Sequence, residues 1–379
     1  MPSDLRSWLL DRVLPFWAER AFDARDGGYV SDLTPDGEVA DRAAPKTCLV
    51  NARLLYCFSH ARCFGAGLWA DTAARRALDF LLTQLRTPEG GWRSSTTPGP
   101  ALFDLYDHAF VLFGLAWWHR ASGDASAITL AAQTMTFLDR TLADAENGGW
   151  HETGKHRLPR RQNPHMHLLE AFHALFESTG DFIWLERAKS AVCLFQTRFF
   201  DSATGTLREL LRADLSPLDG PDGLVREPGH HMEWIWLLLH HRRLTSDDGV
   251  LEPAEALYRT AVRNGVDSRG LLIETMDAAG QARETSTLLW PQTEAVKAAL
   301  ARHEFLGADL APARSFLDAM FHHHIPDDMP LWINRLSETG APLSETVPTR
   351  VLYHLVLGLA EWLRVNERMT PQPLRPGGN

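Results

Sequence analysis

The sequence predicts a mostly α-helical protein folded as an (α/α)6 barrel, and three observations support this. Apolar residues recur at helical spacing along most of the 379 residues, for example in 49–58, 109–116 and 295–300. Glycine turns return at a regular step, and several helices begin at a proline shortly after such a turn. A helix hairpin cannot bury its apolar faces alone, so six hairpins closed into a ring give an inner and an outer layer of helices.

The glycine turns mark the repeat. Six of them follow one another at steps of 56 to 70 residues, and each interval is long enough for two helices. In the first three the glycine precedes Tyr29, Trp92 and Trp150. We therefore expect a single domain over residues 1–379, with short β-ribbons in the loops at one end. The turns lie at Gly28, Gly91, Gly149, Gly205, Gly270 and Gly340.

Prolines mark the start of the second helix in five hairpins, because the first helical position needs no N–H. If all second helices run the same way, their N-terminal turns meet at one end of the barrel. Polar residues early in these helices then converge on one pocket, where aligned helix dipoles favour developing negative charge. The prolines are Pro45, Pro164, Pro228, Pro291 and Pro348.

Composition narrows the function classes. With 45% hydrophobic and 23% charged residues the chain is typical of a soluble globular protein. A net charge of −10 without a basic cluster argues against nucleic acid as a partner. No apolar run reaches the roughly 18 residues of a membrane span. Charged residues interrupt the N-terminus, and the four cysteines form no C-x-x-C pair, so we expect reduced thiols and a cytoplasmic protein. Homo-oligomers remain possible.

The stretch 226–236 carries the most chemistry. Pro228 suits a helix start, which places His230 and Glu233 on one face of the first turn. A histidine beside a carboxylate at a helix N-terminus can stay neutral near pH 7 and act as a base. The alternative is a helix start with solvated polar residues.

Five other residues lie at comparable positions, in or directly before a helix. Arg53 interrupts an apolar helix, so it is either paired in the core or faces a wet cavity. Asn163 opens a helix that carries His167, and Trp290 precedes another helix start, where it can stack on a sugar ring. His354 lies six residues after Pro348 and can form an acid–base pair with His230 across a pocket. Each of these residues can also be plain core.

Metal and cofactor motifs are absent from the sequence. The histidine runs 230–231, 240–241 and 322–324 lack H-x-x-x-H or H-E-x-x-H spacing, so we predict no metal site and no cofactor. A G-x-x-x-x-G-K loop is also missing, which favours an unphosphorylated ligand and no nucleotide.

Taken together, these pieces resemble the N-acylglucosamine 2-epimerase superfamily, which includes cellobiose 2-epimerases and mannose isomerases. The likeness runs over nearly the whole chain and rests on the glycine–aromatic repeats and six short pieces. Trp290-Pro291-Gln292-Thr293-Glu294 and Tyr353-His354-Leu355 are more similar to the mannose isomerase branch. The pieces are 51–56, 106–110, 163–171, 229–233, 290–295 and 353–354.

The resemblance implies an (α/α)6 barrel that moves a proton at C2 of a free sugar without a cofactor. His354 and His230 match the acid–base pair, and a further group of residues matches sugar-contacting positions. D-mannose to D-fructose isomerisation is expected, with 2-epimerisation as the alternative. Glycoside hydrolysis by Glu233 and Glu294, a metal-dependent isomerase and a non-catalytic helical repeat protein are also open. The contacting positions are Arg53, Tyr106, Asn163, His167, Arg226, Glu233 and Trp290.

Overall fold

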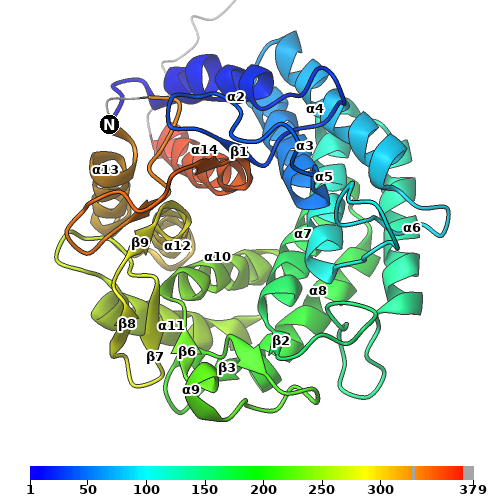
Figure 1. The fold of residues 1–379 in the computed structure, drawn as a ribbon. Coiled ribbons are helices and arrows are strands. Elements are labelled where there is room, and N and C mark those ends of the chain that lie inside the picture. The colour runs from blue at the N-terminus through cyan, green and yellow to red at the C-terminus, as the bar shows by residue number, and fades with distance from the viewer. Residues whose placement is uncertain (327–328, 370–379) are drawn as a thin grey trace, which may run out of the picture.

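The computed structural model describes residues 1–326 and 329–369, and the chain forms the expected (α/α)6 barrel (Figure 1). Six inner helices surround the barrel axis. Each packs against the next, and the last packs against the first, so the ring is closed. The inner helices are α3 (Cys48–Cys63), α5 (Leu105–Ser122), α7 (Asn163–Thr179), α10 (Pro228–Thr245), α12 (Leu289–Leu306) and α14 (Leu352–Met369). The end of the predicted domain, 370–379, lies outside the described residues.

The outer layer packs on the inner one, and most of its helices bury one face and expose the other, as an amphipathic pattern requires. Short helical turns extend several of these helices. The outer helices are α1 (Leu5–Ser7), η1 (Trp8–Val13), α2 (Leu14–Arg20), α4 (Leu68–Phe80), η2 (Leu81–Leu85), α6 (Ser126–Thr141), α8 (Phe182–Leu194), η3 (Phe195–Phe199), η4 (Asp248–Val250), α11 (Leu251–Gly265) and α13 (Ala311–His324).

Short antiparallel ribbons connect the hairpins. β1 (Asp32–Leu33) pairs with β11 (Val347–Pro348), which ties the first hairpin to the last. The other pairs are β2 (Arg160–Arg161) with β5 (Leu210–Leu211), β3 (Phe200–Asp201) with β4 (Thr206–Leu207), β9 (Thr287–Leu288) with β10 (Arg335–Leu336), and the ribbon of β6 (Val225–Arg226), β7 (Thr275–Asp277) and β8 (Ala282–Glu284). Two helical turns, α9 (Gly220–Gly223) and η6 (Thr349–Val351), complete the loops.

The repeated glycines let the turns approach the outer helices. A Cβ at Gly28 would come within 2.6 Å of the Phe80 ring, and one at Gly91 within 2.4 Å of the Phe137 ring. Gly28 also has a φ of +72°, which disfavours other residues. The first two glycine turns are therefore fixed by close packing as well as by chain reversal.

A side chain early in the inner helix holds each of the first five turns. It accepts a hydrogen bond from the backbone N–H just after the turn glycine or at the equivalent position, at 2.8–3.2 Å. We call these five residues the turn anchors. A turn anchor satisfies a buried backbone donor that would otherwise be costly. The bonds run from Tyr29 to Asn51, Trp92 to His108, Trp150 to His165, Leu207 to His231 and Leu272 to Gln292.

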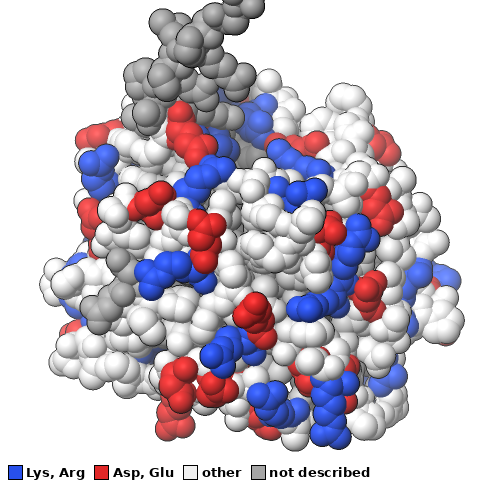
Figure 2. Space-filling model, turned by 90° about the horizontal axis from the view of Figure 1, so that it is seen from above, with Lys and Arg blue, Asp and Glu red and all other residues white. Residues whose placement is uncertain are grey.

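The outer surface mixes charges of both signs. Figure 2 shows lysine and arginine interspersed with aspartate and glutamate over one flank of the barrel. Within the described part of the chain, no helix is both long and apolar enough to cross a membrane. Cys48 and Cys57 are buried thiols, whereas Cys63 and Cys193 are exposed, so only two of the four cysteines belong to the core.

Candidate functional site

A pocket of about 380 Å³ lies at the end of the barrel where the inner helices begin. All six inner helices, or the turns that lead into them, contribute side chains, so the predicted convergence of helix N-termini is confirmed. α10 begins at Pro228 as expected, and α7 begins at Asn163 with Gln162 as its N-cap. The lining residues are Leu49, Arg53, Tyr106, Arg161, Asn163, His167, Glu227, His230, Glu233, Leu288, Trp290, Asn334, Arg350, Val351 and His354.

His354 is arranged as a neutral base. Its Nδ1 lies 2.8 Å from Glu294 Oε1, so Nδ1–H donates to the carboxylate and Nε2 is left to accept a proton. Burial lowers the pKa of His354 to about 3, although Glu294 opposes this effect. Glu294 in turn forms a buried ion pair with Lys297, at 2.7 Å. His354 is thus held uncharged near neutral pH.

His230 is arranged in the opposite way. Burial alone would lower its pKa, but the carboxylates of Glu227 and Glu209 raise the pKa of His230 to about 10. Its Nδ1 lies 2.8 Å from Glu209 and 3.4 Å from Glu227. His230 is therefore a charged acid. Two expectations are corrected: Glu209 and Glu227, not Glu233, orient the ring, and the ring is protonated rather than neutral.

Asn163 faces the other ring nitrogen of His230. Its amide nitrogen lies 2.9 Å from His230 Nε2, and its Oδ1 is buried without a hydrogen-bond partner among the described residues. An amide can offer nitrogen to a neutral ring or, when turned, oxygen to a protonated one. Asn163 can therefore follow a proton onto and off Nε2.

Arg53 places a positive charge against the pocket. Its Nη1 donates to the carbonyl of Arg350 at 2.9 Å, and its Nη2 donates to the Tyr106 hydroxyl at 2.8 Å. The guanidinium also lies over the Phe110 ring, 4.1 Å from its centre. Its Nε is buried and has no acceptor within the described residues. Of the two interpretations of Arg53, the pocket-facing one is supported.

His167 and Glu233 form the floor of the pocket. His167 Nδ1 lies 3.1 Å from Glu170, and its Nε2 lies 3.8 Å from Glu233. Burial, together with the Glu294 carboxylate, holds the pKa of Glu233 well above its usual range, which favours the protonated acid. Glu233 Oε1 is buried and makes no hydrogen bond among the described residues. It is available to a hydroxyl group of a ligand.

Trp290 lies against both histidines. Its ring centre is 5.1 Å from that of His230 and 5.4 Å from that of His354. Gly229 makes this position possible, because a Cβ there would come within 2.6 Å of the Trp290 ring. The indole can thus support a sugar held between an acid and a base.

Arg226 is the predicted contact residue that the structure does not bring to the pocket. It lies on β6, where its Nε donates to Thr206 and its Nη1 donates to the carbonyls of Gly223 and Val225. These hydrogen bonds occupy the guanidinium group, so the predicted contact of Arg226 with a ligand is not supported.

Several pocket residues escaped the sequence reasoning. Glu209 lies 21 positions before its partner His230, and Glu294 lies on a different helix from its partner His354, so no local spacing links them. Arg161 and Arg350 also line the pocket. Each lies within two residues of a predicted helix start, Asn163 or Pro348, which is the signal that could have found them.

Three groups of histidine and carboxylate side chains come within 4.8 Å of one another and could hold a metal ion. They join residues from different elements, which spacing along the chain cannot reveal, so the lack of a metal motif in the sequence does not by itself decide whether a metal binds; the absence of a metal site stays a prediction. The Lys297 ammonium lies 2.7 Å from Glu294 in one group, and a positive charge there opposes a cation. The groups are His167, Glu170 and Glu233; Glu209, Glu227 and His230; and Glu233, Glu294 and His354.

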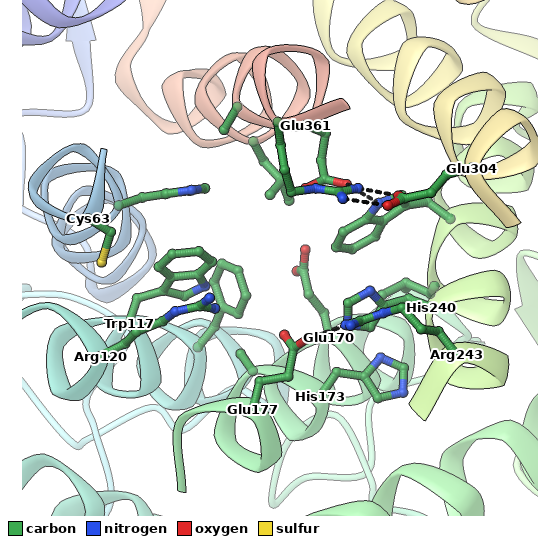
Figure 3. A pocket seen from close by; sticks show the side chains of 18 of the residues that line it. Cys63, Trp117, Arg120, Glu170, His173, Glu177, His240, Arg243, Glu304 and Glu361 are labelled. Carbon is green, nitrogen blue, oxygen red and sulfur yellow. Dashed lines mark hydrogen bonds and ion pairs between the residues drawn. The ribbon is translucent and has the colours of Figure 1, made fainter. Parts of the chain in front are cut away.

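A second pocket, of about 300 Å³, lies where the inner helices end (Figure 3). It contains none of the predicted site residues, and its charges are largely paired with one another, as in the ion pairs of Arg364 with Glu304 and Arg243 with Glu177. Glu170 points into it and links it to His167 at the first pocket. The first pocket, where the neutral His354, the charged His230 and the helix N-termini meet, is the better candidate for chemistry.

Comparison with known proteins agrees with this geometry. The sequence profile described as N-acylglucosamine 2-epimerase (GlcNAc 2-epimerase) matches residues 27–358. The chain belongs to the N-acylglucosamine 2-epimerase family. As a member of this family it is a sugar epimerase or isomerase, and its fold is the (α/α)6 barrel of the family.

Three relatives show how far the likeness extends. A mannose-6-phosphate isomerase of Rhizobium meliloti is 29% identical, over 94% of this chain and 95% of the relative. A D-mannose isomerase of Thermobifida fusca is 27% identical, over 72% of this chain and 73% of the relative. The structure of a cellobiose 2-epimerase from Spirochaeta thermophila superposes with a TM-score of 0.85 at 26% identity, over 97% of this chain and 96% of that one.

Proposed function

We propose that this family member is a metal-independent aldose–ketose isomerase that interconverts D-mannose and D-fructose. The observation that carries the proposal is the opposite protonation of two histidines against one indole. His354 is a neutral base and His230 a charged acid, and both lie beside Trp290. Two of the relatives above bear the names of mannose and mannose-6-phosphate isomerases, which supports the choice of sugar.

The proton transfers follow from these states. Once the ring has opened, His354 Nε2 removes the proton from C2 while His230 gives a proton to the aldehyde oxygen O1, which yields a cis-enediol. His354 then returns its proton to C1 on the same face, and His230 takes the proton of the C2 hydroxyl. The product is the ketose, and both histidines regain their starting states.

The other pocket residues stabilise the charge that develops on the oxygens. Arg53 offers a buried guanidinium with a free Nε, and Asn163 touches the nitrogen of His230 that exchanges the proton. Glu233, as a protonated acid, can donate to a sugar oxygen. The N-terminal ends of six helices add positive potential.

A sugar 2-epimerase is the second candidate. His230 and His354 both lie beside the same indole, so two groups that can transfer protons face one pocket, and epimerisation needs a proton to leave one face of C2 and another to arrive at the opposite face. The cellobiose 2-epimerase structure, at 26% identity, supports this alternative. The choice depends on where the enediol receives its proton.

The deciding experiment follows D-mannose in D₂O by NMR, with protein treated exhaustively with a chelator. Fructose that carries deuterium at C1 is the expected result. Glucose with deuterium at C2 and little fructose would favour epimerisation. No exchange in either product would contradict both candidates, and activity lost on chelation and restored by a metal would contradict metal independence.

A further inference from the structure

Arg350 is a charged side chain without a protein partner at the mouth of the pocket. It belongs to η6, directly before the helix of His354, and its carbonyl accepts a hydrogen bond from Arg53. The backbone is thereby fixed, yet the side chain is exposed. Among the residues that the structure describes, no carboxylate pairs with its guanidinium. The backbone of Arg350 is thus held in place, and its guanidinium group is available to bind a ligand.

Arg161 is a second guanidinium in the lining of the same pocket. It lies on β2, directly before the helix of Asn163 and His167, and its Nε donates to Glu152 at 2.6 Å. Its side chain remains 36% exposed. Burial raises the pKa of the Tyr106 hydroxyl, and the positive charges of Arg53, Arg350 and Arg161 oppose this rise. All three guanidinium groups are therefore close enough to Tyr106 to influence its ionisation, although among the described residues only Arg53 bonds to its hydroxyl.

The charge in this pocket exceeds what a neutral hexose needs. Of the three arginines in the lining, Arg161 is paired with the buried Glu152, as His230 is with Glu209, whereas Arg53 and Arg350 have no carboxylate partner among the described residues. Burial holds the pKa of Glu233 well above its usual range, so this carboxyl group adds little negative charge. Arg53 and the helix N-termini already serve an enediolate and Arg161 is paired with Glu152, which leaves Arg350 as the guanidinium without a task.

We infer that Arg350 and Arg161 form a phosphate subsite at the mouth of the pocket, so that the substrate is the 6-phosphate ester of the hexose. This rests on the proposed isomerase function. C1 and C2 lie deep, at His354 and His230, so the far end of the open chain points to the mouth. Guanidinium groups bind phosphate in a bidentate manner and need no glycine loop, so the missing G-x-x-x-x-G-K motif does not oppose this.

Binding tests the subsite apart from catalysis. Mannitol 6-phosphate and mannitol are open-chain probes that lack a carbonyl and cannot react, and calorimetry compares their affinities. We expect the phosphate ester to bind at least tenfold more tightly. Arg350→Ala should remove most of this difference and Arg350→Lys only part of it. Arg259→Ala, an exposed position on the outer helix α11, is the matched control and should keep the difference. Equal affinities, or an unchanged difference in Arg350→Ala, would overturn the subsite.

Kinetics then connects the subsite with turnover. The ratio of kcat/KM for mannose 6-phosphate to kcat/KM for mannose should exceed ten and should fall about tenfold in Arg350→Ala. A ratio near one overturns the phosphate preference and leaves the isomerase proposal intact. If neither sugar is turned over, the isomerase proposal fails, while the mannitol comparison still decides the subsite.

Discussion

Lys297 lies with its ammonium 2.7 Å from the Glu294 carboxylate, and both side chains are fully buried. Because the positive charge of Lys297 also lowers the pKa of His354, Lys297→Met should raise that pKa. We expect the acid limb of the kcat/KM profile, where the base becomes protonated, to move to higher pH. Loss of one partner of a buried ion pair should also cost about 3–5 kcal/mol of stability.

A matched control uses the same spacing at the surface. Lys189 and Glu186 form an ion pair across one helical turn, 2.6 Å apart and largely exposed. Lys189→Met should leave both the pH profile and the melting temperature nearly unchanged, because solvent screens such pairs. An unmoved acid limb in Lys297→Met would contradict a positioning role for Lys297.

Glu209→Gln should shift the opposite limb. The amide oxygen can still accept from His230 Nδ1–H, but the negative charge that helps to raise the pKa of His230 to about 10 is gone. His230 then loses its proton at lower pH, so the basic limb of kcat/KM should move down. Glu252→Gln, at an exposed position of α11, provides the comparison. A basic limb that stays in place would show that another group sets it.

His108→Gln should make the protein less sensitive to acid. Burial lowers the pKa of His108 to about 4, below the value of about 6.5 for an unfolded histidine. Its contribution to stability is therefore full above pH 6.5 and is lost, to the extent of roughly 3 kcal/mol, as the pH falls towards 4. Glutamine serves as a turn anchor at Gln292, so it should keep the bond to Trp92 without titrating.

Urea unfolding at pH 7.5 and pH 5 measures this effect. The difference in unfolding free energy between the two pH values should be smaller in His108→Gln than in the parent. His108→Ala should lower stability at both values, because the Trp92 N–H is then left without its acceptor. Equal pH sensitivity of parent and glutamine variant would argue against the mechanism.

Gly229→Ala should weaken substrate binding with little loss of helix stability. Alanine suits a helix better than glycine. Its Cβ, however, would come within 2.6 Å of the Trp290 ring, which is too close. The indole must then move away from the two histidines, and we expect kcat/KM to fall about tenfold, a loss of about 1.4 kcal/mol. Gly154→Ala, where a Cβ meets nothing within 4 Å, should behave as the parent does.

The features that the sequence could predict are local ones. Periodicity and the glycine step predict the barrel, and the prolines place the helix starts, so Asn163, His230 and Trp290 reach one pocket. The charge states could not be predicted. His230 is protonated because Glu209, 21 residues earlier in the chain, adds its charge to that of the adjacent Glu227, and the contact with Glu209 leaves no trace in local spacing. For the same reason the sequence could not show that the side chain of Arg226 bonds to Thr206 and to backbone carbonyls rather than to a ligand.

The pairing of β1 with β11 and the packing of α14 on α3 have a consequence for folding. A linear array of helical repeats has two free ends, at which it can fray one unit at a time. A ring has no such end. Every repeat packs against two neighbours, so it cannot unfold without disrupting its contacts with both. Unfolding should therefore be all-or-none across the six hairpins, despite the size of the chain. The candidate pocket, to which every hairpin contributes, should disappear in that same transition.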